Sequence, residues 1–242
     1  MFAERRPSGE AAEAERKPAR AAIVAARNEA DRIGATLGAL ARALPGATLL
    51  VADDASSDGT AEIAMRYGAE VVSRGRPHGK GANVTAAAEA LLSRSGEAAA
   101  VVLLCDGDLG DSAAGLAPLV QAVERGDCDL AVAGFARRQG GGFGIAVGYA
   151  REQIERLCGF RAETPISGQR AMRAELLREL LPFADGFGIE LGMTVDAVRA
   201  GYELREIELP LAHRATYRTL GGFLHRARQL RDFRRAARAR RR

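Results

Sequence analysis

Carboxylates stand at the ends of several predicted strands, and two of them are separated by a single glycine. The apolar run 98–104 is short and uncharged, which is typical of a buried strand in a parallel sheet, and Asp106-Gly107-Asp108 follows it. Two acidic groups at contact distance need a cation or a raised pKa. Aspartate oxygens suit Mg2+ or Mn2+, and Gly107 lets the backbone approach a ligand. We therefore predict a divalent-cation site for a diphosphate at this strand end.

Two other predicted strand ends also carry acidic residues. Glu29 follows the apolar run 21–26. Asp53 and Asp54 follow the run 48–52. Ligands of open α/β sheets bind outside the carboxyl ends of the strands. One acidic strand end is an ordinary polar turn, but three on one sheet edge are a hypothesis for a binding site.

A glycine-rich basic loop at residues 74–81 contains Lys80 between two glycines. A lysine in that setting could cap a phosphate or a base edge, or it could be an ordinary solvent-exposed loop residue. The loop lacks the hydroxyl and the spacing of a Walker motif, which disfavours ATP hydrolysis. The residues after the first strand lack the G-x-G-x-x-G pattern of dinucleotide-binding folds. Lys80 is therefore a candidate for phosphate binding outside both motif classes.

Short apolar strands alternate with amphipathic helices through the first half of the chain. Strands are predicted at 21–26, 48–52, 70–73, 98–104 and 129–133, and helices at 33–44, 61–67, 82–92 and 116–123. This alternation indicates an α/β fold with a mostly parallel central sheet and right-handed crossovers. In the second half we expect a polar loop at 164–170, helices ending near 157 and 200, another helix around 176–180, and a strand at 202–209.

The composition is that of an ordinary globular protein, with 47% hydrophobic and 27% charged residues among 242. Aromatic residues make up 5% and tryptophan is absent, which disfavours stacking on single-stranded nucleic acid. Three widely spaced cysteines form no disulfide or metal pattern and suit a reducing cytoplasm. The first 20 residues lack the apolar core of a signal peptide, and no apolar run reaches the roughly 18 residues of a spanning helix. We therefore expect a cytoplasmic protein.

Basic residues are concentrated near the C-terminus. Residues 213–242 hold eleven arginines and one acid, Asp232, whereas the remainder of the chain has 24 basic and 30 acidic residues. This tail could be an amphipathic helix on anionic lipid, a nucleic-acid patch or a solvated end, and the few apolar residues after Phe233 favour the last. We predict a disordered leader at 1–20, one domain at 21–215 and a basic C-terminal helix or tail at 216–242.

Four segments together resemble family 2 glycosyltransferases with the GT-A fold. They are Ala26-Arg27-Asn28-Glu29, residues 51–60, Gly79-Lys80-Gly81 and Asp106-Gly107-Asp108. The resemblance covers about residues 21–226. It implies a single GT-A (Rossmann-like) domain that binds a nucleotide-sugar donor.

The same resemblance implies roles for individual residues. The donor's nucleoside would be held by the loop at Ala26, Arg27 and Glu29 and by Asp53 or Asp54. Lys80 would lie over the base or the phosphates. Asp106 and Asp108 would form the DxD motif, which binds Mg2+ or Mn2+ and the donor.

The second half resembles glucosyl-3-phosphoglycerate synthases and related enzymes in residues 165–168, 186–192 and 211–214. In that group a histidine of the last segment joins the metal shell, so the resemblance implies His213 as a third ligand. It also implies that Ser167, Gly168 and Arg170 bind the acceptor, since this loop would offer backbone N–H groups to a phosphate. Residues 167–170 resemble dolichyl-phosphate mannosyltransferases as well, so a polyprenyl-phosphate acceptor at a membrane surface stays open.

The predicted reaction is transfer of a sugar from a UDP- or GDP-linked donor to a phosphorylated small acceptor such as 3-phosphoglycerate. Asp108 would act with the metal, which neutralises charge on the diphosphate leaving group. Glu190 follows a glycine turn on the expected acceptor side. If the enzyme inverts, Glu190 or Asp111 is the candidate base.

The expected partners are the nucleotide-sugar donor and the phosphorylated acceptor, and no nucleic acid. Peripheral contact with the inner face of the membrane through the arginine-rich tail, and a homodimer, are left open. A nucleotidyltransferase is an alternative, but it would show a glycine-rich basic stretch after the first strand, which residues 27–29 do not supply. A non-catalytic adaptor on a degenerate fold is a second alternative, and intact Asp106, Asp108 and Lys80 disfavour it.

Overall fold

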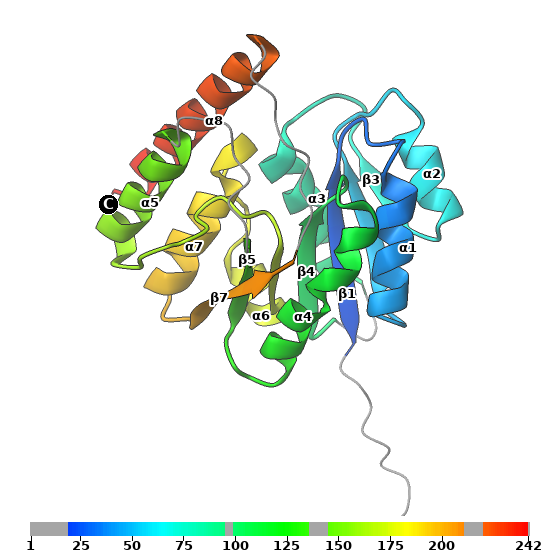
Figure 1. Ribbon diagram of the computed structural model, residues 1–242, viewed down its shortest axis with the longest axis horizontal. Coiled ribbons are helices and arrows are strands. Elements are labelled where there is room, and N and C mark those ends of the chain that lie inside the picture. The colour runs from blue at the N-terminus through cyan, green and yellow to red at the C-terminus, as the bar shows by residue number, and fades with distance from the viewer. Residues whose placement is uncertain (1–18, 95–98, 136–144, 211–219, 242) are drawn as a thin grey trace, which may run out of the picture.

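The computed structural model describes residues 19–94, 99–135, 145–210 and 220–241, which form one sheet with helices on both faces (Figure 1). The strands are β1 (Arg20–Ala26), β2 (Thr48–Asp53), β3 (Glu70–Ser73), β4 (Val101–Asp106), β5 (Leu130–Phe135), β6 (Arg170–Arg173) and β7 (Leu204–Leu209). Their order in the sheet is β3-β2-β1-β4-β6-β5-β7. All pairings are parallel except those of β6, which is antiparallel to β4 and β5.

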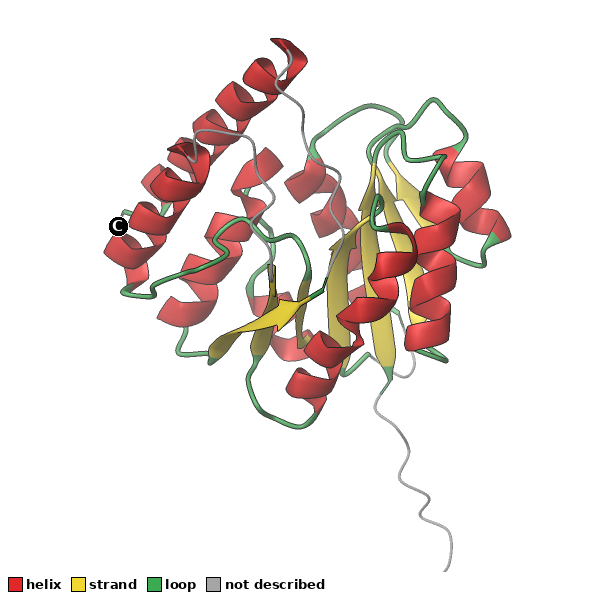
Figure 2. Ribbon diagram, viewed as in Figure 1, coloured by secondary structure: helices red, strands yellow, loops and turns green. Residues whose placement is uncertain are grey.

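The helices of the described residues surround this sheet in layers (Figure 2). They are α1 (Ile33–Ala43), α2 (Thr60–Arg66), α3 (Lys80–Leu92), α4 (Ala117–Glu124), α5 (Ile145–Cys158), α6 (Ala174–Glu179), α7 (Ile189–Arg199) and α8 (Leu220–Ala239), with 3-10 turns η1 (Gly110–Leu116) and η2 (Gly186–Gly188). One face of the sheet packs against α1, η1 and α4, and the other against α3, α6 and α7.

The central strands are apolar in their interior positions because both faces of the sheet are covered. In β1, Ala22 and Val24 pack into the core on one face, and Ala21 and Ile23 into the core on the other. All four are at most 1% exposed. Full burial of a side chain the size of Val24 or Ile23 stabilises the fold by about 1.5–3 kcal/mol. The two cores therefore hold the carboxyl ends of the strands in fixed positions.

The mixed α/β fold predicted from the sequence is confirmed, with two differences that bear on the site. Lys80 is the first residue of α3 rather than a loop residue, since the helix begins two residues earlier than expected. The predicted loop at 164–170 runs into a short strand, β6, which the sequence did not indicate. That strand has four residues with an arginine at each end, so its apolar signal is limited to Ala171 and Met172.

Helix α8 packs against α5 and α7 (Figure 1). Phe233 is 1% exposed, and Ala236 and Ala237 are buried with it in a third apolar cluster. The favoured prediction of a solvated end is therefore wrong for this helix, because its apolar residues are spaced to pack on the domain.

None of the described helices is long and apolar enough to cross a membrane. Residues 1–18 of the predicted leader lie outside the described part of the chain. Its last residue, Arg20, is the first residue of β1.

Candidate active site

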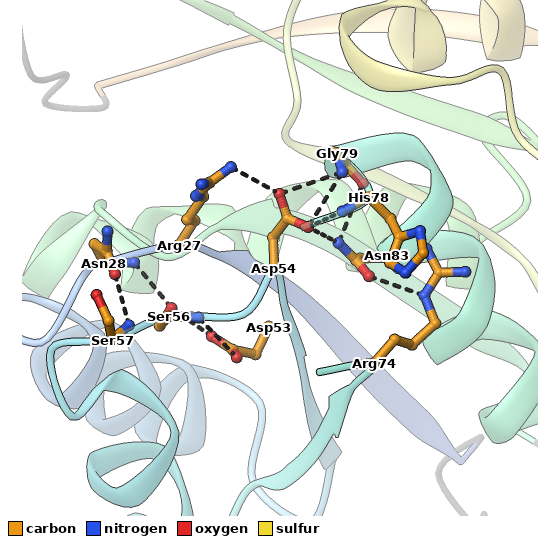
Figure 3. Close-up of polar contacts among 10 residues, drawn as sticks. All are labelled: Arg27, Asn28, Asp53, Asp54, Ser56, Ser57, Arg74, His78, Gly79 and Asn83. Carbon is orange, nitrogen blue, oxygen red and sulfur yellow. Dashed lines mark hydrogen bonds and ion pairs between the residues drawn. The ribbon is translucent and has the colours of Figure 1, made fainter. Parts of the chain in front are cut away.

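Asp54 connects the end of β2 to the start of α3 (Figure 3). Its carboxylate accepts the backbone N–H groups of His78, at 2.6 Å, and Gly79, at 3.1 Å, together with the side-chain amide of Asn83. Asp54 is only 6% exposed, and a buried carboxylate is costly unless donors of this kind surround it. Asp54 therefore fixes the glycine-rich loop that leads into α3.

The loops after β1 and β2 are tied to each other by hydrogen bonds (Figure 3). The Asn28 N–H donates to Ser56 Oγ at 2.9 Å, and Asn28 Oδ1 accepts the Ser57 N–H at 2.9 Å. Asp53 accepts both the hydroxyl and the N–H of Ser56. The N–H of Glu29 donates to the threonine hydroxyl at the first residue of α2 at 2.9 Å. These bonds give the two loops one defined shape at the edge of the sheet.

The residues predicted for the donor side lie together at this edge. The strand register places Asp53 beside Ala26 and Asp106 beside the preceding residue of β1. Ala26 and Asp53 are buried, whereas the Arg27 side chain is 54% exposed and lies 3.3 Å from Asp54. Arg27 is therefore the predicted donor-side residue with the most accessible charge, while Asp53 and Asp54 shape the loops.

Lys80 lies between two carboxylates that come from distant parts of the chain. Its Nζ is 2.6 Å from Asp106 Oδ1 and 2.8 Å from Glu190 Oε1. Burial lowers the pKa of the Lys80 ammonium, but Asp106 and Glu190 more than offset this and raise the pKa above its ordinary value. The Lys80 ammonium therefore links the end of β4 to the start of α7 through two ion pairs.

Gln169 is a contact of Asp106 that the sequence did not single out. Its Nε2 donates to Asp106 Oδ2 at 2.7 Å, and its side chain is almost completely buried. The preceding residue, Gly168, is so close that an added Cβ would lie 2.5 Å from Lys80 Nζ and 2.8 Å from Asp106 Oδ2. The predicted acceptor loop thus meets the predicted metal motif directly. No sequence pattern marks Gln169, because its role depends on the antiparallel strand that begins at the next residue.

Arg170 does not reach the surface, although the resemblance implied that it contacts an acceptor. It is 0% exposed, its Nε donates to the carbonyl of Ser167 at 2.8 Å, and its Nη1 donates to Thr194 Oγ1 at 2.9 Å. Burial lowers its pKa to about 10, with Glu190 and Glu206 opposing that shift. In this structure Arg170 lies on the buried side of the Ser167–Gly168 loop, and its hydrogen bonds link this loop to α7.

The turn at Gly107 is closely packed, which explains the glycine between the two aspartates. Its N–H donates to the Ala25 carbonyl at 2.8 Å, and its own carbonyl accepts the Thr36 hydroxyl at 2.8 Å. A Cβ at this position would lie 3.2 Å from the Ala25 carbonyl oxygen. The backbone carbonyl of Asp108 accepts Arg32 Nη1 at 3.2 Å. Helix α1 therefore holds the Asp-Gly-Asp turn in place.

Asp106 and Asp108 suit a divalent cation by their chemistry. They place two carboxylate groups one residue apart at a strand end, and hard cations such as Mg2+ and Mn2+ prefer oxygen ligands of this kind. The Asp106 side chain is 33% exposed, so one side of it faces away from the protein interior. Within the described ranges no group of three His, Cys, Asp or Glu side chains could hold a metal ion. His213, the predicted third ligand, lies outside the described residues.

The two candidate bases have very different surroundings. Glu190 is 5% exposed, and its carboxylate accepts a hydrogen bond from Lys80 Nζ. The Asp111 side chain is 84% exposed and lies 3.3 Å from Arg42 of α1. Only Glu190 therefore belongs to the cluster formed by Lys80 and Asp106.

Comparison with known proteins identifies the class to which this arrangement belongs. Residues 21–181 match glycosyl transferase family 2. The chain therefore belongs to glycosyl transferase family 2 and is a glycosyltransferase, which sets aside the nucleotidyltransferase and adaptor alternatives. The N-terminal motifs that carried the resemblance lie within the matched range.

Individual relatives are similar over most of this chain. Glucosyl-3-phosphoglycerate synthase of Mycolicibacterium paratuberculosis is 33% identical over 199 residues, which are 72% of this chain and 58% of that protein. Undecaprenyl-phosphate mannosyltransferase of Micrococcus luteus is 28% identical over 208 residues, 79% of this chain and 83% of that one. The matched region thus spans little more than half the length of the synthase.

Solved structures share the fold. The crystal structure of glucosyl-3-phosphoglycerate synthase from Mycobacterium tuberculosis with phosphoglyceric acid has a TM-score of 0.73 at 26% identity, covering 92% of this chain and 80% of that one. The same synthase with Mn2+, UDP-glucose and phosphoglyceric acid has a TM-score of 0.71 at 26% identity, covering 91% and 80%. The fold described above is accordingly the GT-A fold.

Proposed function

We propose that this glycosyltransferase moves a sugar from a UDP- or GDP-linked donor to a phosphorylated small acceptor such as 3-phosphoglycerate. The observation that carries the proposal is the contact of Gly168 with Lys80 and Asp106. It brings the loop suited to an acceptor phosphate against the residues suited to the donor diphosphate. The M. tuberculosis synthase, of the same fold, was solved with Mn2+, UDP-glucose and phosphoglyceric acid.

The donor would lie along the carboxyl ends of β1, β2 and β4. Arg27 provides an accessible positive charge there, and the loops held by Asp53 and Asp54 shape the nucleoside site. Asp106 and Asp108 would hold Mg2+ or Mn2+. When bound, such an ion neutralises the negative charge that builds on the leaving diphosphate.

Lys80 and Glu190 act where donor and acceptor meet. Asp106 and Glu190 raise the pKa of Lys80, which favours its charged form, so Lys80 would contribute a positive charge beside the diphosphate. Glu190 holds that ammonium at 2.8 Å and is the candidate group on the acceptor side. The loop at Ser167 and Gly168 would bind and orient the phosphate of the acceptor, which is ionised at neutral pH. If a hydroxyl oxygen of the acceptor attacks the sugar with inversion, Glu190 is the candidate base that takes up its proton.

The test is release of nucleoside diphosphate from UDP- and GDP-sugars with Mg2+ or Mn2+, in the presence and absence of 3-phosphoglycerate. We expect release that requires both the metal and the phosphorylated acceptor. A matched pair of variants, Lys80→Met in the site and Arg125→Met in the loop before β5, separates the site from a general charge effect. Full turnover of Lys80→Met, or release of pyrophosphate in place of nucleoside diphosphate, would contradict the proposal.

A polyprenyl phosphate is a second candidate acceptor, and the surface of α8 favours it. Exposed arginines line this helix at Arg228, Arg231, Arg234, Arg235 and Arg238, and Arg241 lies just beyond its end. Within the described residues only Arg231 among them pairs with a carboxylate, that of Asp232. Anionic lipid attracts such a helix by about 1 kcal/mol per arginine near the surface. The M. luteus relative is an undecaprenyl-phosphate mannosyltransferase.

Sedimentation with vesicles distinguishes the two acceptor classes. A membrane-surface enzyme would pellet with phosphatidylglycerol vesicles in low salt, remain free with phosphatidylcholine vesicles, and be released by salt. Replacing Arg228, Arg235 and Arg238 with glutamine would then weaken the binding by roughly 100-fold. Absence of pelleting together with turnover of 3-phosphoglycerate would leave a cytoplasmic enzyme with a soluble acceptor.

A further inference from the structure

One acidic residue of the arginine-rich helix α8 points into the protein rather than to solvent. Asp232 is 8% exposed, and its Oδ2 accepts the backbone N–H of Phe187 in η2 at 3.3 Å. Its Oδ1 accepts Arg231 Nε at 3.2 Å. η2 leads directly into α7, which begins one residue before Glu190. The C-terminal helix thus contacts the turn that delivers the candidate acceptor-side carboxylate.

Three glycines around this turn allow α8 to approach closely. An added Cβ at Gly186 would lie 2.3 Å from Asp232 Oδ2, and one at Gly188 would lie 2.8 Å from the Cβ of Ala236. A Cβ at Gly192 would lie 2.8 Å from Arg240 Nη2. Asp232, Ala236 and Arg240 are four residues apart, so they lie on one face of α8. The glycines of residues 186–192 are therefore explained by packing against α8.

The other side of the same turn contacts the start of α3, which carries Lys80. An added Cβ at Gly81 would lie 2.0 Å from the carbonyl oxygen of Ala184, and one at Gly79 would lie 3.5 Å from the Cα of Gly186. The turn is thus held between α3 and α8. A shift of α8 at Asp232 would displace the turn and change the 2.8 Å contact between Glu190 and Lys80.

We propose that Asp232 is a positioning residue for Glu190, and that α8 is therefore a working part of the active site. This proposal rests on the proposed function, because it assigns the effect of Asp232 to the transfer reaction. Asp232 itself touches no reacting group: it holds the N–H of Phe187 and thereby the first turn of α7. The alternative is a purely structural role, in which Asp232 only stabilises the packing of α8.

A second contact between α8 and α7 supplies the matched control. The guanidinium of Arg240 binds both carboxylate oxygens of Asp196, with Nε 2.7 Å from Oδ1. This pair fastens the same two helices but lies nearly two turns of α7 beyond Glu190. Breaking it loosens the helix pair without touching the turn.

The kinetic experiment compares Asp232→Ala, Asp232→Asn and Asp196→Ala. We expect Asp232→Ala to lower kcat by about 10- to 100-fold, with little change in the KM of the donor, because a misplaced group about 1 Å from its working position can cost 100-fold. Asp232→Asn keeps an acceptor oxygen for the Phe187 N–H and should restore most of the rate. Asp196→Ala should lower the melting temperature and leave kcat within about twofold.

A double-substitution cycle tests whether Asp232 acts through Glu190. In the Glu190→Gln background, Asp232→Ala should lower kcat by much less than it does in the wild-type background. Equal fold-losses in the two backgrounds would overturn the proposal, as would a rate loss in Asp196→Ala as large as that in Asp232→Ala.

Amide hydrogen exchange provides a readout that does not depend on activity. Peptides that contain Phe187 to Glu190 should exchange faster in Asp232→Ala than in Asp196→Ala. Unchanged exchange in Asp232→Ala would overturn the positioning role even if the enzyme proves active. Faster exchange in a protein without transferase activity would instead refute the proposed reaction and leave the contact standing.

Discussion

The two sides of the candidate site are held in shape by different means. On the donor side, polar side chains bind nearby backbone: Asp54 accepts two N–H groups and Asn28 bridges two loops. On the acceptor side, glycines let neighbouring elements pack closely against α3 and α8. The buried Arg170 binds the carbonyl of Ser167 and so supports the acceptor loop. The shape of the donor side therefore depends on hydrogen-bonding groups, whereas the shape of the acceptor side depends on glycines that leave room for close packing.

This difference has a consequence for substitutions. A polar donor-side residue can be replaced by an isostere with a graded loss, because the loop keeps its other bonds. A glycine on the acceptor side has no smaller substitute, and any side chain there forces neighbouring backbone or functional groups to move. The following predictions test the contrast, beginning with the largest expected effect.

The largest loss is expected at the metal motif. Replacing Asp108 with Ala removes one of the two carboxylates proposed to hold the cation, and transfer should fall by at least about 100-fold. Asp127→Ala is the control, because Asp127 precedes β5 at the opposite edge of the sheet and pairs only with Arg125 in the described structure. Initial rates at several Mn2+ concentrations measure the effect, and normal turnover in Asp108→Ala would rule out the metal scheme.

The second prediction concerns the point where the two sides meet. In Gly168→Ala the new methyl group would overlap Lys80 Nζ and Asp106 Oδ2, so we expect kcat/KM to fall by about tenfold. Gly148→Ala is the matched control, since no atom of the described residues lies within 4 Å of a Cβ there and alanine favours its helix. A wild-type rate in Gly168→Ala would show that the loop can yield, which would weaken the contrast between the two sides.

The third prediction measures the buried support of the acceptor loop. Lysine in place of Arg170 keeps the charge but reaches fewer acceptors, so the Ser167 carbonyl or Thr194 loses its partner. We expect the free energy of unfolding to fall by about 1–3 kcal/mol in urea titrations. Arg161→Lys, at an 85% exposed side chain, should change it by less than about 0.5 kcal/mol.

The smallest effect compares the buried thiol at the end of β4 with a thiol at the end of α5, away from the site. Burial and the neighbouring Asp106 raise the pKa of Cys105, so at pH 8 it is a protonated and inaccessible thiol. Burial also raises the pKa of Cys158 at the end of α5, but this thiol is only partly buried. Iodoacetamide followed by mass spectrometry should label Cys158 first in the native protein and Cys105 only after unfolding. Early labelling of Cys105 would mean that the end of β4 opens readily.

The sequence predicted where β2 and β4 end, because the signals for these strand ends are local. Apolar runs that end in Asp53 or Asp106 identify a strand and its carboxyl end within a few residues. The site residues Gln169 and Asp232 escaped prediction because each acts on a residue more than 40 positions away. The motif places Arg170 at the acceptor, but the side chain is fully buried. Neither spacing nor composition reveals the burial of a single charged side chain.

The antiparallel strand β6 sets the order in which the sheet can be completed. Strands β1 to β4 form a continuous parallel block that has emerged from the ribosome by residue 106. β5 is synthesised next, but in the described part of the sheet β6 lies between β5 and β4. β5 therefore joins the block through β6, whose last residue is 173. A nascent chain can therefore form the nucleotide-sugar half early, while its other half waits for a four-residue strand to bridge the sheet.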